Sequence, residues 1–336
     1  MVEFDFASEG SEIGMIRPIR RIYRRTPKPR SELMTETIAL RQAITRRRFL
    51  QTMSGTFLGV VAGRAFAQQV DTSGWVTYHP DLLKTAVKRK NDLYPLSDQE
   101  NRKKWVKYEP MSDEFKGDTL DATKWRPYNP TWQGRQPGWF DPGNVSVRDG
   151  CLNLTMRLGD PPEKMRASGY HTYTSAAVQS VGTVLYGYFE VRAKPMASAG
   201  SSSFWFYKSD PDIWTEIDVF EIGGKAKGYE NKDNITVHVF YTPTIKSHFQ
   251  IHEEWVAPFN MDSDFHVYGL EWDEKELKFY LDGVLIREGP NTYWHQALTM
   301  NFDSETMPDW FGLPDKADLP SVYRIDYVRS WKKKGE

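Results

Sequence analysis

The chain has 336 residues, a formal net charge of −1 and 14% aromatic residues. This length accommodates a large core in one domain, and the near-balanced charge excludes a general polyanion binder, so we expect no nucleic-acid partner. No run of roughly 18 or more apolar residues occurs, which argues against a membrane span, and a single cysteine, Cys151, excludes an intrachain disulfide.

Residues 1–67 carry three signals of an export leader in the expected order. The segment Thr45–Gln51 (Thr-Arg-Arg-Arg-Phe-Leu-Gln) resembles a twin-arginine signal, and a short, weakly apolar run follows from Met53 to Gly63. The segment Ala65–Ala67 then supplies a small-x-small cleavage site. We therefore expect residues 1–67 to be removed and the mature protein to be periplasmic or extracellular.

The remaining chain divides into an extension and a domain. Within the leader, Met34 would be a more typical start, which makes residues 1–33 a candidate misassigned extension. Residues 68–110 are polar and mixed, with a short helical stretch around 81–91, and we interpret them as an N-terminal extension that packs on the domain or links to it. Residues 111–336 are expected to form the domain.

Short stretches of alternating apolar and polar residues fill this domain. Turn residues separate most of them, and Leu281–Val284 (Leu-Asp-Gly-Val) is typical of a hairpin. Many short strands with almost no helical periodicity predict an all-β fold, a two-sheet antiparallel β-sandwich. The predicted strands cover residues 144–147, 152–156, 176–180, 187–193, 203–206, 213–222, 235–241, 266–272, 276–281, 284–288, 299–302 and 323–331.

The stretch Trp214–Glu221 places three carboxylates among β-branched and aromatic neighbours, a composition typical of a strand. In a strand, Glu216 and Asp218 share one face. Regular alternation would send Glu221 to the apolar face, where a lone carboxylate is costly. A β-bulge between Asp218 and Glu221 returns Glu221 to the carboxylate face and turns Phe220 toward the core.

Two carboxyl groups about 5–5.5 Å apart are the requirement of retaining glycoside hydrolysis. In that chemistry one carboxylate attacks the anomeric carbon, and the other protonates the leaving oxygen. Asp218 between Glu216 and Glu221 would push their pKa values apart. A solvated acidic strand or a metal site is the alternative interpretation, but the E-x-D-x-x-E spacing with apolar spacers favours the hydrolase.

The motif Glu216–Glu221 resembles the catalytic signature of glycoside hydrolase family 16, in the bulged form of its agarase, porphyranase, carrageenase and laminarinase branches. The resemblance covers roughly residues 114–331 and implies a jelly-roll, concanavalin-like sandwich with a concave substrate cleft. It also implies that Glu216 is the nucleophile, that Asp218 assists it, and that Glu221 is the acid/base. No cofactor is expected in the chemistry.

Aromatic side chains suit the apolar faces of sugar rings, and fixed polar groups suit their edges. The loop Trp132–Asp141 contains Trp132, Arg135 and Trp139 and is similar to the agarase-type loop, which implies that these three side chains line the cleft. Trp205 is expected to form a wall near the cleaved bond. For each of them, core packing or a surface charge is the alternative.

Three further positions are candidate substrate contacts. His238 resembles the histidine in the cleft of the family, although a lone histidine on a strand is more often structural, and Trp214 could face either way. The block 301–314 resembles the agarase and porphyranase branch, which implies that Glu305 binds a sugar hydroxyl beside the cleavage point.

The last predicted strand matches the closing strand of the family. The resemblance implies that Asp326 helps to hold a structural calcium ion, with backbone oxygens near Glu114 and Gly150. Because calcium takes several oxygen ligands, one aspartate cannot specify such a site.

These observations predict a monomeric, exported, endo-acting glycoside hydrolase whose partner is a polysaccharide. The resemblance implies a β-1,4 linkage in a red-algal galactan, with agarose first and porphyran second. The alternatives are a carrageenan hydrolase, a laminarinase-type β-glucanase, a transglycosylase and a non-catalytic, lectin-like carbohydrate-binding protein. A sulfated galactan would need cations aimed at sulfate, and the available ones are Arg126, Arg135, Arg166, Lys208 and Lys225.

Overall fold

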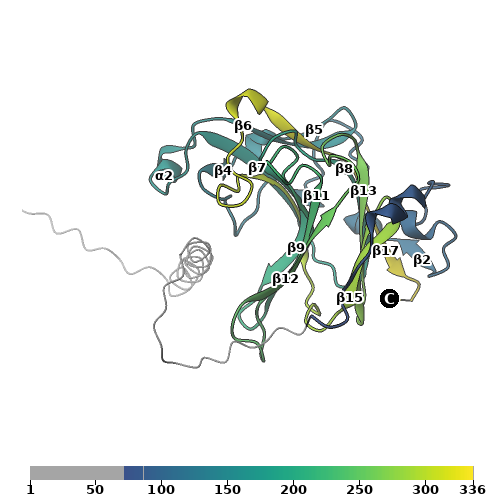
Figure 1. Ribbon diagram of the computed structural model, residues 1–336. Helices are drawn as coiled ribbons and strands as arrows, with labels where there is room; N and C mark the ends of the chain where they lie inside the picture. Colours follow the sequence, from purple (N-terminus) through teal and green to yellow (C-terminus); the bar gives the residue numbers. More distant parts are fainter. Residues whose placement is uncertain (1–71, 86, 336) are drawn as a thin grey trace, which may run out of the picture. The chain divides into compact units, whose positions relative to one another are not determined.

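The structure, a computed structural model, describes residues 72–85 and 87–335. The leader predicted for residues 1–67 lies outside this range. Two β-sheets pack against each other across one core (Figure 1), which confirms the predicted all-β sandwich. Within the described residues, no helix is both long and apolar enough to cross a bilayer.

The first sheet, here called the carboxylate sheet, contains the acidic motif near its middle. All its neighbouring strands are antiparallel. In spatial order it consists of β12 (Phe249–Val256), β11 (Lys232–Tyr241), β10 (Trp214–Ile222), β9 (Ser201–Ser209), β16 (Thr299–Glu305), β7 (Tyr173–Ser180) and β3 (Trp125–Arg126).

The second sheet, here called the opposing sheet, is also antiparallel. Its order is β1 (Val76–Thr77), β15 (Val284–Pro290), β14 (Glu276–Leu281), β13 (His266–Trp272), β8 (Gly187–Lys194), β17 (Ser321–Lys333), β6 (Cys151–Leu158) and β5 (Val145–Arg148), and β2 (Trp105–Lys107) pairs with the end of β17. Strand β7 joins the two sheets, because it pairs with the end of β6 and, in parallel, with β4 (Gly138–Phe140).

Helices within residues 72–85 and 87–335 are short. The α-helix α2 covers Glu163–Arg166, and the described 3-10 turns are η1 (Pro80–Thr85), η2 (Leu96–Asp98), η3 (Glu109–Met111), η4 (Pro142–Asn144) and η5 (Lys316–Asp318). The helical stretch expected around 81–91 is thus a 3-10 turn that ends at Thr85.

Aromatic side chains fill the space between the sheets. The ring of Phe220 on β10 lies 4.2 Å from that of Tyr268 on β13, and Phe206 on β9 lies 5.1 Å from Phe189 on β8. Because these side chains take the inner face of each strand, the polar residues that alternate with them are left on the outer face.

The predicted strands match the observed ones apart from their ends, but β12 and the short β1 to β4 were missed. Phe249, Ile251 and Trp255 of β12 alternate as an amphipathic strand should, and Glu253 between them breaks the pattern. Cys151 is buried on β6, where burial raises the pKa of its thiol.

The described part of the extension is tied to the opposing sheet. Strand β1 pairs with the edge strand β15. Arg89 and the backbone N–H of Leu96 both donate to the fully buried carboxylate of Glu190. The ammonium of Lys103 lies 2.6 and 2.7 Å from the two oxygens of Glu271, which is also buried. The extension therefore supplies the positive charges for two carboxylates of the sheet.

Candidate active site

The β-bulge on β10 lies where the spacing of the carboxylates predicted it. Asp218 pairs with Trp205 of β9, but the next pairs along the ladder are Phe220 with Phe204 and Glu221 with Ser203. One extra residue on β10 therefore sits between Asp218 and Phe220. That residue, Val219, packs in the core together with Ile217 and Phe220. Glu216, Asp218 and Glu221 consequently share the outer face of the carboxylate sheet, here called the carboxylate face.

The carboxylates differ in their contact with water. Glu216 and Asp218 are 6% and 4% exposed, and Glu221 is half-buried. Desolvation raises the pKa of Glu221 well above its usual value, and the negative charge of Asp218 raises it further. The positive charge of Arg135 acts in the opposite direction on the pKa of Glu221. A glutamic acid that keeps its proton can act as a general acid.

His238 on β11 lies beside this group. It pairs with Glu216 in the strand register, and its Nε2 atom lies 3.2 Å from Oδ2 of Asp218. The other ring nitrogen, Nδ1, lies 3.0 Å from Nε2 of His248. His238 is thus oriented on Asp218 by contacts at both ends of its ring.

Trp205 forms part of the carboxylate face next to Asp218. Its indole N–H donates to Oδ2 of Asp303 at 2.7 Å, and its ring stacks on Tyr207 with centroids 4.7 Å apart. Asp303 is 3% exposed, and desolvation, followed by the charge of Glu305, raises its pKa well above the usual value. Asp303 thus holds the orientation of Trp205.

The loop around Trp132 meets the end of β16. The indole N–H of Trp132 donates to Oε1 of Glu305 at 2.6 Å, and a guanidinium nitrogen of Arg135 lies 3.6 Å from Oε2 of Glu305. The hydroxyl of Thr306 donates to the backbone carbonyl of Arg135. Three of the residues proposed from sequence as substrate contacts therefore form one cluster, in which Glu305 connects the two others.

The other two candidate tryptophans, Trp214 and Trp139, are buried or half-buried. Trp214 shares the face of Glu216, but it is 4% exposed and its ring stacks on Phe240 at 4.0 Å. Trp139 is half-buried on β4, between the buried Gly138 and Phe140. For both residues the role in sugar binding stays a prediction.

Comparison with known proteins identifies the family. The profile described as "Beta-porphyranase A-D, GH16 domain" matches residues 105–333. The chain belongs to glycoside hydrolase family 16. It is 34% identical to beta-porphyranase E of Zobellia galactanivorans over 256 residues, which cover 68% of this chain and 88% of that protein. The family resemblance inferred from the acidic motif is therefore confirmed, and with it the assignment as an O-glycosyl hydrolase of the retaining type.

Solved structures agree with the fold. Porphyranase B of Zobellia galactanivorans superimposes with a TM-score of 0.61 at 27% identity, covering 68% of this chain and 92% of that chain. Beta-agarase A of Zobellia galactanivorans gives the same TM-score at 19% identity, covering 73% and 98%, which supports the fold alone.

A metal ion is a possible ligand of the acidic motif on β10. Among the described residues, Glu216, Asp218 and His238 are the one group whose ligand atoms all lie within 4.8 Å of one another. Three such ligands are fewer than calcium takes. The absence of a catalytic cofactor stays a prediction.

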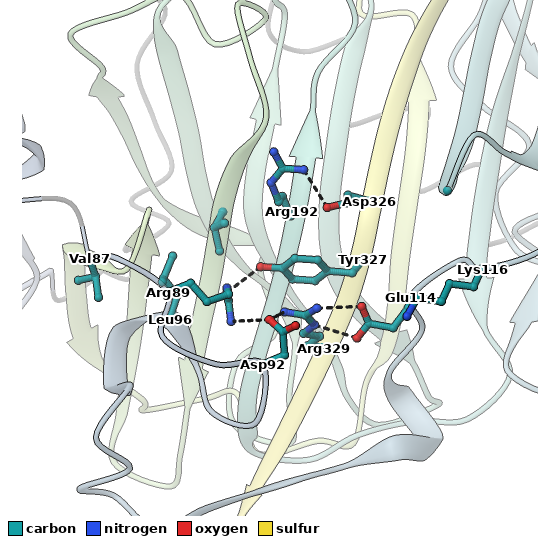
Figure 2. A pocket seen from close by; sticks show the side chains of 12 residues that line it. Val87, Arg89, Asp92, Leu96, Glu114, Lys116, Arg192, Asp326, Tyr327 and Arg329 are labelled. Carbon is teal, nitrogen blue, oxygen red and sulfur yellow. Dashed lines mark hydrogen bonds and ion pairs between the residues drawn. The ribbon is translucent and has the colours of Figure 1, made fainter.

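The carboxylates near the calcium site expected on the opposing sheet already form ion pairs with arginines. Asp326, Glu114 and Gly150 line one pocket of about 610 Å³ (Figure 2). Arg192 donates to Asp326 at 2.8 Å, and Arg329 donates to both oxygens of Glu114 at 2.8 Å. Further cationic side chains, Arg89 and Lys116, also line the pocket. These side chains do not supply the oxygen set that calcium needs, so calcium binding stays an untested expectation.

Several polar residues of the carboxylate face were missed at the level of sequence. Asp303 alternates with Glu305, so a period of two from Glu305 would have found it. His252 lies on β12, which the sequence analysis missed, and His248 directly precedes that strand. His252 faces the same side as Asp218, since both pair with Thr236.

Proposed function

We propose that this chain is an endo-acting, retaining hydrolase of a red-algal galactan, with porphyran as the first candidate substrate. The observation that carries the proposal is the bulge, which brings Glu216 and Glu221 to one face while burial and the charge of Asp218 raise the pKa of Glu221. Glu216 attacks the anomeric carbon, and Glu221 protonates the departing glycosidic oxygen. Glu221 then deprotonates the water that releases the glycosyl-enzyme.

Asp218 acts on both glutamates without reacting itself. Its negative charge helps to keep the proton on Glu221 until the bond breaks. Nε2 of His238 lies 3.2 Å from Oδ2 of Asp218, close enough for an ion pair when the imidazole is protonated.

Four of the five cations singled out in the sequence are engaged by other groups of the protein. Of the five cations singled out in the sequence, three are paired with aspartates: Arg166 with Asp160, Lys208 with Asp210, and Lys225 with Asp318. Arg126 donates to the backbone carbonyl of Ser180.

Arg135 is the cation whose charge acts on Glu221. Its guanidinium lies 5.9 Å from the ring of Trp132, and its buried Nε has no hydrogen-bond partner among the described residues. A planar guanidinium beside an aromatic ring suits a sulfated sugar. Together with the porphyranases among the relatives, this favours porphyran over agarose, the reverse of the order expected from sequence.

The test is a panel of porphyran, agarose, carrageenans and laminarin, with reducing-end release, product mass and the anomeric configuration of the first product measured by NMR. We expect the largest kcat/KM on porphyran, oligosaccharide products and retention of configuration. Release from agarose alone would restore the order expected from sequence, and strong activity on laminarin alone would overturn the galactan assignment. Sugar transferred to oligosaccharide acceptors instead of water would indicate a transglycosylase.

Glu216→Gln separates a hydrolase from a sugar-binding protein of the same fold. We expect kcat to fall by more than about 1,000-fold while porphyran oligosaccharides still bind, because the amide cannot form the glycosyl-enzyme bond. The surface variant His79→Gln is the matched control, since the side chain of His79 is 75% exposed. Unchanged turnover in Glu216→Gln would rule out the proposed nucleophile.

We also propose export of the mature chain through the twin-arginine signal at Thr45–Gln51. Replacement of Arg46 and Arg47 by lysine is expected to retain the uncleaved chain inside the cell, measured by fractionation and N-terminal sequencing. Cleavage and release of that double variant would exclude this route.

A further inference from the structure

A row of side chains, here called the cross-strand row, runs over the carboxylate face from the catalytic strand to β3. Asp218 on β10 pairs with Trp205 on β9, and Trp205 pairs in turn with Asn301 on β16. Asn301 pairs with Gln179 on β7, and Gln179 pairs with Arg126 on β3. Because paired residues of neighbouring strands point to the same side, these side chains share the carboxylate face. Strands lie about 4.8 Å apart, so the row spans about 19 Å from β10 to β3.

The middle of the cross-strand row is a fixed polar floor. The side-chain amides of Gln179 and Asn301 form a hydrogen bond of 3.0 Å. Both residues are as deeply buried as the catalytic carboxylates. Amide groups held in this way suit the hydroxyl groups of sugars, because their positions do not have to be ordered when a ligand binds.

Arg126 ends the cross-strand row with an uncompensated charge. Its guanidinium donates to the backbone carbonyl of Ser180 at 2.9 Å and lies 3.5 Å from the side-chain oxygen of Gln179. Both acceptors are neutral, and no carboxylate within residues 72–85 and 87–335 forms an ion pair with Arg126. The half-buried guanidinium is therefore oriented by the protein while its positive charge stays available to an anion.

An exposed aromatic ring follows in the same segment. Tyr128 is 46% exposed, and one residue separates it from β3. The next residue, Asn129, ties the segment down, because its Oδ1 accepts from the hydroxyl of Tyr207 and from the backbone N–H of Trp132, each at 3.1 Å. Tyr207 pairs with Glu216 and so belongs to the carboxylate face. The segment that carries Tyr128 therefore borders this face.

We propose that Arg126 and Tyr128 form a distal subsite of the cleft, in which Arg126 binds the sulfate group of a sugar and Tyr128 packs on its apolar face. A planar guanidinium suits an oxyanion, and an aromatic ring suits the C–H face of a sugar. Two residues of the row, Asn301 and Gln179, lie between this subsite and Trp205, where they offer amide groups to the intervening sugars.

This inference rests on the proposed function and deepens it. The substrate would be recognised through a second sulfate group, far from the one assigned to Arg135. A contact four strands away from β10 also requires the polysaccharide to extend well past the cleavage point, which agrees with endo action.

The test compares Arg126→Gln with Tyr128→Ala in the full chain, each combined with Glu216→Gln so that the ligand is not cleaved. The ligands are a porphyran octasaccharide and the same octasaccharide after desulfation, with affinities measured by isothermal titration calorimetry. His79→Gln in the same background is the control, since its side chain is exposed. Thermal unfolding is recorded for every variant, because Arg126 also holds the carbonyl of Ser180.

We expect Arg126→Gln to weaken binding of the sulfated octasaccharide by roughly tenfold and to leave the desulfated one within about twofold, because one charged hydrogen bond is lost. Arg126→Lys should recover part of the loss. Tyr128→Ala should weaken both ligands by similar factors, since stacking needs no sulfate. With Glu216 intact, Arg126→Gln should raise KM on porphyran and keep kcat within about twofold, because the distal contact is equal in ground and transition states.

An unchanged affinity of Arg126→Gln for the sulfated octasaccharide would overturn the distal subsite. Equal losses with both octasaccharides, together with a lower Tm, would overturn it as well, since Arg126 would then be structural. The proposed function fails in a different way. Binding that depends on Arg126, without any hydrolysis of porphyran by the parent chain, would reject the hydrolase and retain the subsite.

Discussion

The two outer faces of the sandwich hold their carboxylates in opposite surroundings. On the opposing sheet, Glu114 accepts two hydrogen bonds from Arg329, which lower the pKa of Glu114 (Figure 2). On the carboxylate face, desolvation and the charge of Asp218 raise the pKa of Glu221, against one nearby cation, Arg135. Ion pairing thus lowers the pKa of Glu114 on one face, whereas burial and a neighbouring negative charge raise the pKa of Glu221 on the other.

The contributions of Glu114 and Glu221 to folding stability should change with pH in opposite directions. The pKa of Glu114 is lower in the folded chain than in the unfolded chain, so its contribution to stability is present above its unfolded pKa, about 4.3, and is lost as the pH falls through the folded value. The pKa of Glu221 is raised by folding, so its contribution falls as the pH rises from about 4.3 to the folded value.

Glu221→Gln removes the proposed general acid and should give the largest effect on kcat. We expect kcat to fall by about 100- to 10,000-fold and the alkaline limb of the pH profile to disappear, because the general acid is lost. At pH 8 the variant should unfold at a higher temperature than the parent, since an unfavourably buried carboxylate is gone. A lower Tm at pH 8 would contradict the raised pKa.

Arg135→Ala tests whether the cation whose charge acts on Glu221 also serves the substrate. Loss of a charged hydrogen bond to sulfate should lower kcat/KM on porphyran by roughly 10- to 100-fold and leave any activity on agarose nearly unchanged. Arg135→Lys keeps the charge without the planar fork, and it should recover only part of the loss. Equal losses of kcat/KM on porphyran and agarose would mean that Arg135 does not bind the sulfate group.

Arg329→Met removes the cation that pairs with Glu114 on the opposing sheet. The side chain of Arg329 is 6% exposed, so we expect the free energy of unfolding to fall by about 2 kcal/mol at neutral pH, measured by urea denaturation. The difference should shrink below pH 4 as Glu114 becomes protonated. Activity on porphyran at 25 °C should stay near the parent value, and a large loss of kcat would show that the two faces are coupled.

Removal of divalent cations should have the smallest effect. Because Arg192 and Arg329 already engage the carboxylates of the pocket, chelation is expected to shift Tm by less than about 1 °C. A Tm that rises steadily with added calcium would show that backbone oxygens near Glu114 and Gly150 hold the ion.

The sequence predicted the sandwich and the bulge because both follow from local alternation. The spacing of Asp218 and Glu221 allows one solution that keeps both carboxylates out of the core, and Val219 and Phe220 are apolar enough to fill it. The predicted strands agree with the structure for the same reason.

Contacts between distant segments could not be predicted in this way. His248 reaches His238 from the position just before β12, a strand whose alternation is broken by Glu253, and Asp303 on β16 reaches Trp205 on the neighbouring strand β9. Arg329 and Glu114 are 215 positions apart, so no local pattern links them. The family resemblance implied which carboxylates react but left open the residues that orient them.

The link between the extension and the opposing sheet bears on how the enzyme is produced. A gene trimmed to residues 105–333 would follow the family boundary and omit Arg89 and Lys103. Glu190 would then lose two donors, Arg89 and the backbone N–H of Leu96, and Glu271 would lose Lys103. Because removing one partner from a charge pair at a sheet surface destabilises the fold, we expect the trimmed chain to unfold at a lower temperature. Expression from the start of the mature chain keeps both cations, and a shortened enzyme that aggregates would reflect this boundary and not a defect of the catalytic residues.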